Sequence, residues 1–344
     1  RQPDDTYEPG AFNQPAASHD KYEQFPMERT YSEWLMSDFA TAPVDMGGRF
    51  GGNNPLVSTC QDCHMPSSEG AACVFSDPRP ELPLHNFNGA NYRVFGAVRT
   101  LYPDYETMLS EDSVNEALAR THAMLEAASD LELSQSGAHI ISRVINQSGH
   151  KLPTGYAEGR VVWVNVKFLD DQGAVIAEHG VYDDSTATLT KSDTKVYQAK
   201  MGISASVAAL TGKPEGESLH FALNNTWLFD NRIPPRGFTN TNFEAVQASP
   251  VGYTYADGQH WDDSEFVIPD GADSAEVRVF YQATTKEYIE FLRDENTTNT
   301  AGQVAYDAWV AAGKSPPVEM DFGIIEISCV GDWDDNGLLN TGDF

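Results

Sequence analysis

The chain has 344 residues, of which 40% are apolar and 21% charged, so it can form two or three domains with a sizeable core. Its 51 acidic and 22 basic side chains give a formal charge of −29, which disfavours nucleic acid and anionic membrane surfaces as partners. No stretch reaches the roughly 20 apolar residues of a membrane span. The chain starts at Arg1 without a leader, and we interpret it as a processed or partial segment of an exported protein.

The first 130 residues predict a unit built mainly of loops and helices. Apolar residues at helical spacing predict a short helix over residues 28–40, and a Gly/Asn-rich loop follows at 47–55. Residues 66–103 are rich in proline and loop signals. A longer helix is predicted over 112–128, with Ser110 as its N-cap.

The pattern changes to strands after residue 130. Strands are predicted at 139–146, 160–169, 174–182, 195–200, 218–223, 265–268, 276–282 and 321–329, and helices at 283–294 and 301–313. The fold class is therefore α+β: a loop- and helix-built unit (residues 1–130) packed on a mainly antiparallel, β-sandwich-like domain with a few short helices (residues 131–329). Residues 330–344 form a separate acidic segment.

The segment Cys60-Gln61-Asp62-Cys63-His64 is a C-x-x-C-H motif. In this motif the two thiols form thioethers with haem, and the adjacent histidine is the proximal iron ligand. A zinc site would need a second ligand pair, which the other cysteines do not supply as C-x-x-C. A thioredoxin-like dithiol would need a preceding strand, whereas a Gly/Asn loop precedes this motif. We therefore expect one covalent haem c on Cys60 and Cys63, with His64 as proximal ligand.

The sixth iron ligand decides between electron transfer and catalysis at an open site. His85 is the preferred candidate, because a loop histidine flanked by Phe87 and Gly89 can approach a porphyrin closely. His150, bracketed by glycine and proline, and His19, in the N-terminal arm, are the alternatives.

Three segments together resemble exported bacterial multihaem cytochromes c: residues 60–66, which end in C-H-M-P, residues 85–89, and the G-H-x-x-P-T-G turn at 149–155. The resemblance implies bis-histidine haems that lie close enough for electron hopping. This chain has a single haem motif, so the other haems would lie outside it. His19 or His150 would then be able to serve a neighbouring haem.

Two features concern the C-terminal end. Cys73 and Cys329 remain once the haem takes two of the four cysteines, and an exported protein favours a disulfide between them, with two buried thiols as the alternative. Residues 332–343 resemble the calcium loop of a dockerin-type repeat. The expected ligands are Asp332, Asp334, Asn336, Leu338 (through its carbonyl), Asn340 and Asp343.

The sequence thus predicts an electron-transfer cytochrome rather than an enzyme, placed in an extracellular, cell-surface or periplasmic assembly. Its expected partners are other haem proteins or neighbouring haems, or copies of itself in an oligomer or filament. The alternatives are a haem enzyme with an open sixth site, such as a peroxidase or small-oxide reductase, and a secreted calcium-dependent binding or adhesion module in which haem is structural.

Overall fold

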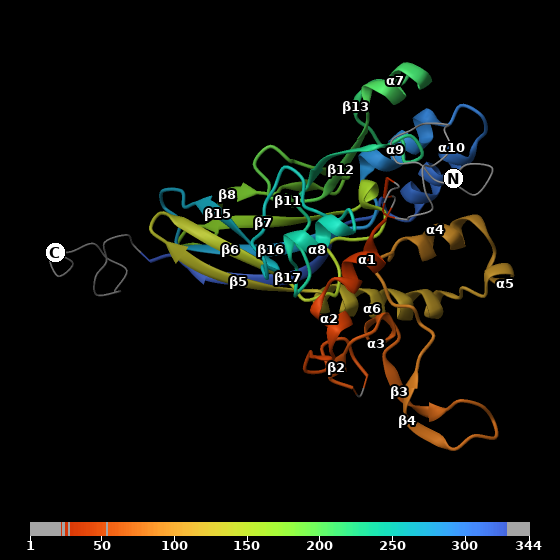
Figure 1. The fold of residues 1–344 in the computed structure, drawn as a ribbon. Helices are drawn as coiled ribbons and strands as arrows, with labels where there is room; N and C mark the ends of the chain where they lie inside the picture. Colours follow the sequence, from red (N-terminus) through yellow and green to blue (C-terminus); the bar gives the residue numbers. More distant parts are fainter. Residues whose placement is uncertain (1–21, 23–24, 27, 53, 329–344) are drawn as a thin grey trace.

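The computed structural model describes residues 22, 25–26, 28–52 and 54–328, with short helices and loops at one side and long strands at the other (Figure 1). His19, Cys329 and the calcium ligands predicted between Asp332 and Asp343 lie outside the described residues. None of the helices in the described ranges is long and apolar enough to cross a membrane.

The N-terminal region (residues 28–127) consists of short elements joined by loops. Its helices and strands are α1 (Thr30–Leu35), α2 (Asp38–Thr41), β1 (Val44–Asp45), β2 (Leu56–Val57), α3 (Cys60–His64), β3 (Ser67–Ala71), β4 (Pro78–Pro83), α4 (Val94–Leu101), α5 (Asp104–Thr107) and α6 (Glu111–Ala127). The helix predicted over 112–128 is confirmed as α6, and the Ser110 hydroxyl caps it by accepting from the Ser113 backbone N–H. The helix predicted over 28–40 is two helices, because the chain turns at Ser37, whose extended backbone begins α2.

The sheet region (residues 129–328) holds two larger antiparallel sheets. One has the order β15-β6-β5, from β15 (Trp261–Val267), β6 (His139–Asn146) and β5 (Ser129–Ser136). The other has the order β11-β7-β16-β17, with β8 also paired to β7, from β11 (Val196–Tyr197), β7 (Val161–Leu169), β16 (Ser274–Gln282), β17 (Val318–Glu326) and β8 (Val175–His179).

Smaller elements cover this region. They are η1 (Ala157–Gly159), β9 (Tyr182–Asp183), β10 (Thr188–Leu189), β12 (Ala199–Ile203), α7 (Ala205–Thr211), β13 (Gly216–Glu217), β14 (Thr226–Asp230), α8 (Asn240–Ala245), α9 (Lys286–Glu295) and α10 (Ala301–Ala311). The strand predicted at 218–223 is wrong, because Leu219 and His220 accept backbone hydrogen bonds from Phe221 and Asn224 and the chain turns locally.

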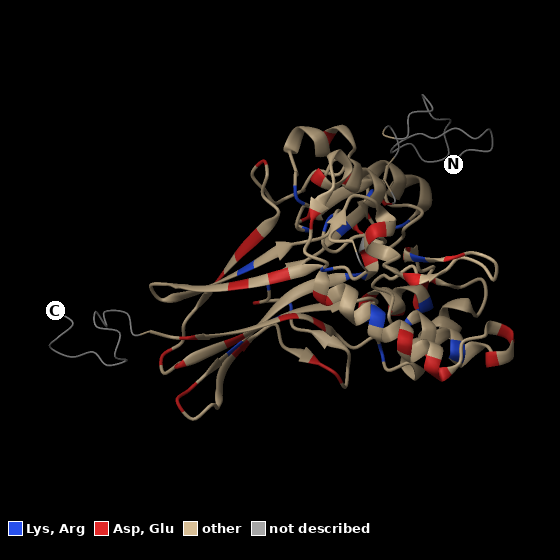
Figure 2. Ribbon diagram, turned by 90° about the horizontal axis from the view of Figure 1, so that it is seen from below, with Lys and Arg blue, Asp and Glu red and all other residues tan. Residues whose placement is uncertain are grey.

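One core joins the two sheets and part of the N-terminal region. Ile140 and Val144 from β6, Val164 from β7 and Val277 from β16 belong to one cluster of buried residues, and Leu125 of α6 joins it. The fold is thus α+β, with antiparallel strands in several sheets and helices gathered mainly toward one end. Acidic residues are spread along the strands and over the helices (Figure 2), as expected for a solvated acidic surface.

Candidate haem site

The C-x-x-C-H motif forms the short helix α3, whose first turn is fixed by a capping box. The Thr59 hydroxyl accepts from the Asp62 backbone N–H, while the Asp62 carboxylate accepts from the backbone N–H groups of Thr59 (2.8 Å) and Ser58 (2.9 Å). Burial opposes ionisation of Asp62, but these hydrogen bonds outweigh it and lower the pKa of the carboxyl. Asp62, one of the two residues between the cysteines, therefore holds the motif in helical form.

His64 at the end of α3 is oriented by a backbone carbonyl. Its Nδ1 hydrogen-bonds to the carbonyl oxygen of Asn88, so Nδ1 carries the proton and Nε2 keeps its lone pair. An N–H to carbonyl bond of this kind is what usually fixes the ring of a metal-binding histidine. His64 is thus arranged to bind a metal through Nε2.

A cavity of about 600 Å³ opens beside α3. Pockets that hold a cofactor-sized ligand span roughly 300–1,000 Å³. Cys60, Cys63 and His64 line it together with His150. The apolar part of its wall includes Trp34, Phe39, Phe50, Val57, Met124, Leu125, Ala128, Leu152 and Pro153, and polar side chains such as Thr30, Thr154 and Arg160 also line it.

The loop after β6 carries His150 to this cavity. The Asn146 side-chain amide donates to the carbonyl of His150 (2.7 Å) and to the carbonyl of Ile233 (2.9 Å), which ties the loop to the sheet region. Gly149 lets the loop pass close to the aromatic wall, since a Cβ there would lie 3.2 Å from Trp34 Cδ1 and 3.4 Å from Phe39 Cδ2. His150 therefore has a defined position relative to the strands.

His150 is also oriented through Nδ1. This nitrogen lies 3.2 Å from the carbonyl oxygen of Lys151 and 3.3 Å from the Ser148 hydroxyl, so it is protonated and Nε2 is the free nitrogen. Burial lowers the pKa of His150, although the charge of Glu33 opposes the shift. The neutral imidazole that metals bind is thereby favoured.

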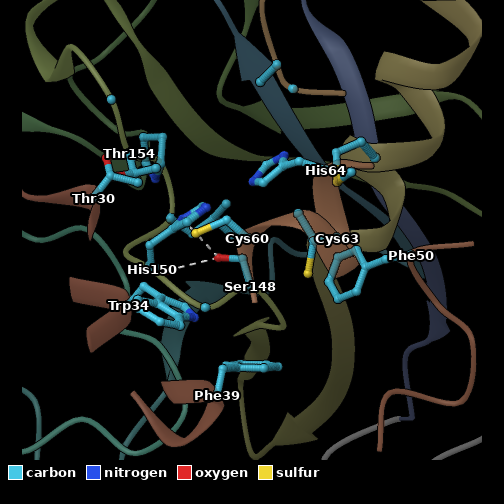
Figure 3. A pocket seen from close by; sticks show the side chains of 18 of the residues that line it. Thr30, Trp34, Phe39, Phe50, Cys60, Cys63, His64, Ser148, His150 and Thr154 are labelled. Carbon is cyan, nitrogen blue, oxygen red and sulfur yellow. Dashed lines mark hydrogen bonds between the residues drawn. The ribbon is translucent and has the colours of Figure 1, made fainter. Parts of the chain in front are cut away.

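The imidazoles of His64 and His150 both lie at the cavity (Figure 3). Their ring centroids are 6.3 Å apart and their planes are nearly parallel, with an interplanar angle of 12°. Imidazole nitrogens bind transition metals at about 2 Å, which puts two such rings on opposite sides of one iron with their centres roughly 6 Å apart. The spacing, the two free Nε2 atoms, the neighbouring thiols and the cavity volume fit a bis-histidine haem c.

The state of Cys63 argues against a dithiol redox site. Burial, together with the charge of Asp62, raises the pKa of the Cys63 thiol to about 12. Reactive C-x-x-C dithiols depend instead on a lowered thiol pKa. Cys60 is exposed, so the cavity opens to the surface on the side of the motif.

The structure does not bring His85 to the cavity. His85 is exposed, its ring contacts Phe87 at a centroid distance of 5.9 Å, and it is absent from the cavity wall. The preference for His85 as distal ligand is therefore not supported, because the loop after β4 directs this side chain outward, whereas the loop after β6 turns His150 inward. Cys73 is exposed in the loop between β3 and β4 and forms no disulfide with another described residue, and its predicted partner Cys329 lies outside the described residues.

Sequence reasoning missed the residues that support the site from behind. Glu33 is buried in α1, and its Oε2 accepts from the Lys151 backbone N–H and from the Thr154 hydroxyl, both at 3.0 Å. Lys151 is also buried, and its Nζ lies 2.7 Å from Asp230 Oδ2. Arg232 binds the same carboxylate at 2.6 Å. The available signal was a single acidic residue, Glu33, in a short helix beside Trp34.

Comparison with known proteins adds one structural likeness. No protein-family model matches the sequence, and no curated protein matches it. The crystal structure of a penta-heme cytochrome c552 from Thermochromatium tepidum is similar with a TM-score of 0.41 and 14% sequence identity, over 90% of this chain and 52% of that one. The chain thus spans about half the length of that cytochrome.

Proposed function

We propose that this chain is a c-type cytochrome that carries electrons through one covalently attached haem, with His64 and His150 as its two axial ligands. The observation that carries this proposal is the pair of parallel imidazoles, 6.3 Å apart, on a cavity lined by both cysteines of a C-x-x-C-H motif. Bound haem supplies a one-electron iron couple.

The protein contributes orientation and exclusion of water. Asn88 and Lys151 accept hydrogen bonds from the two Nδ1 atoms and so fix both ring orientations. The aromatic and aliphatic wall would keep water away from a bound haem and lower the dielectric constant around it. With both axial positions supplied by side chains held in this way, the site favours electron transfer over chemistry at an open coordination position.

Substitution of the two histidines tests this assignment. The ferric holoprotein should give a low-spin bis-histidine optical and EPR spectrum. His150→Ala should convert it to a high-spin form that binds added azide or cyanide, whereas His85→Ala, the matched control, should leave the spectrum unchanged. A high-spin wild-type protein that turns over peroxide or nitrite would instead support the haem-enzyme alternative.

We also propose that the chain works in an exported assembly with other haem-bearing subunits or further copies of itself. Among the described residues, the five most exposed large apolar side chains all belong to the N-terminal region: Val74 (93%), Phe75 (97%), Phe87 (70%), Tyr105 (80%) and Met108 (80%). Val74 and Phe75 are adjacent in the chain, and a partner subunit that covered them would remove apolar surface from water. Phe75→Ser should weaken association measured by light scattering or sedimentation, and Leu210→Ser, at a 67% exposed position in the sheet region, should not.

A further inference from the structure

Helix α1 contacts both sides of the candidate haem site. On the distal side, Glu33 Oε2 accepts from the Lys151 backbone N–H and from the Thr154 hydroxyl, both at 3.0 Å. The Thr30 hydroxyl lies 2.8 Å from the same Thr154 hydroxyl. Two residues of one short helix thus hold the segment that follows His150.

The same helix also reaches the proximal side. The Trp34 indole Nε1 donates to the carbonyl oxygen of Ser58 at 3.0 Å. The backbone N–H of Ser58 in turn donates to Asp62, inside the capping box of α3. Residues adjacent in α1 are therefore bonded to the segment that carries His64 and to the segment that carries His150.

We infer that α1 is a clamp that sets the spacing and orientation of the two imidazoles, and that Glu33 is the positioning residue for His150. The inference rests on the proposed function, because it concerns how His150 is held as an axial ligand. Glu33 touches neither imidazole through a hydrogen bond and acts through the backbone of Lys151.

The cost of burying these charges supports a positioning role. Glu33, Lys151, Asp230 and Arg232 are all buried and form a group with two negative and two positive charges. A buried group of this kind is often no more stabilising than apolar residues of similar volume, so stability alone does not account for it. Hydrogen bonds fixed in a low-dielectric interior do, however, define one geometry for the loop.

Glu33 exerts two effects that can be separated. Its hydrogen bonds hold the loop, while its charge balances that of Arg232, whose Nη2 lies 3.9 Å from Glu33 Oε1. Glu33→Gln removes the charge and keeps an acceptor oxygen, leaving one uncompensated positive charge behind His150. Thr154→Val keeps the charge and removes one of the two bonds to the carboxylate.

The experiment uses haem-loaded full-length protein. Glu33→Gln should raise the reduction potential with little change in the ferric EPR g-values. Thr154→Val and Glu33→Ala should shift the g-values and speed displacement of the distal ligand by cyanide at least tenfold, equal to about 1.4 kcal/mol. Glu217→Gln removes the charge from an exposed pair with Lys200 and is the matched control, for which no change is expected.

The outcomes distinguish this inference from the proposed function. If His150→Ala becomes high-spin while Glu33→Ala and Thr154→Val keep wild-type g-values, exchange rates and potentials, the clamp is wrong and the ligand assignment stands. If His150→Ala stays low-spin, the ligand assignment itself fails, and the clamp fails with it. Should Glu33→Ala not fold, as judged by circular dichroism, Thr154→Val and Thr30→Val decide the question.

Discussion

The two regions of the molecule bury their apolar residues in different ways. In the sheet region, residues of both larger sheets meet in one continuous core, and Val164, Val166 and Val277 are fully buried. In the N-terminal region, a small cluster includes Phe39, Phe50 and Val57, which also line the cavity. His150 thus lies in a loop of the sheet region, whose core also takes in Leu125 of the N-terminal region, whereas His64 belongs to the N-terminal region, whose own small cluster lines the cavity.

The most extensive expected effect, loss of order in a whole region, follows from this difference. Protein that carries Cys60→Ala and Cys63→Ala and lacks haem should lose order in the N-terminal region while the sheet region persists, because the small cluster of the N-terminal region lines the cavity, whereas most of the larger core lies away from it. Hydrogen exchange should show residues 38–64 exchanging about 100-fold faster or more than in the holoprotein, equal to roughly 3 kcal/mol of lost local stability. Amides of β6, β7 and β16 should be unaffected. Uniform acceleration across both regions would contradict the contrast.

The elements that the sequence predicts correctly are those with a local signal. The strand predicted at 139–146 has the bounds of β6, and Ser110 caps α6, because alternation and capping are local signals. Strand β4 was missed because Pro78, Pro80 and Pro83 indicate a loop, although an edge hairpin tolerates them.

His150, which we propose as the distal ligand, was named from the sequence only as an alternative to His85. His85 was preferred because Phe87 and Gly89 flank it and because it lies 21 positions after His64, whereas His150 lies 86 positions after it. The approach of His150 depends on Asn146 holding the loop and on Gly149 allowing it to pass Trp34. The Asn146 hydrogen bond spans only four positions, but the close approach of Gly149 to Trp34 joins segments far apart in the chain, and no local pattern indicates that approach.

The charged group behind His150 should matter far more to stability than an exposed ion pair. Lys151→Met leaves Glu33 and Asp230 with Arg232 as the remaining buried positive charge, and breaking a buried pair in this way costs about 3–5 kcal/mol. Lys200→Met, which removes an exposed pair with Glu217, should cost about 0–1 kcal/mol. The free energies of unfolding of both variants, measured with denaturant, give the comparison. Equal losses of unfolding free energy would show that the burial of Glu33, Lys151, Asp230 and Arg232 does not affect stability.

A smaller effect is expected where the loop of His150 meets the N-terminal region. Gly149→Ala places a Cβ 3.2 Å from Trp34 and 3.4 Å from Phe39, so the aromatic wall must shift. Overpacking of this kind costs about 1–3 kcal/mol. Gly89→Ala is the control, because the nearest atom to its Cβ is the Phe87 carbonyl oxygen at 4.0 Å. If Gly149→Ala lowers the melting temperature no more than the control does, Trp34 and Phe39 move aside without a measurable loss of stability.

The smallest expected effect is a pH dependence where the two regions meet. Burial raises the pKa of Asp321 on β17 to about 6, and the charge of Asp130 adds to the shift, although the Ser129 hydroxyl donates to the carboxylate and Arg49 opposes it. Since the folded state then binds a proton that the unfolded state has released, this group's contribution to stability falls as pH rises from about 4 to about 6.

Asp321→Asn should remove that slope and stabilise the protein by about 1 kcal/mol at pH 7, below the full value of a two-unit shift because solvent still reaches the group. The control is Asp171→Asn at an exposed turn, which should change neither the pH dependence of stability nor the midpoint of urea unfolding. A loss of stability in Asp321→Asn at pH 7 would show that the fold needs the ionised carboxylate of Asp321.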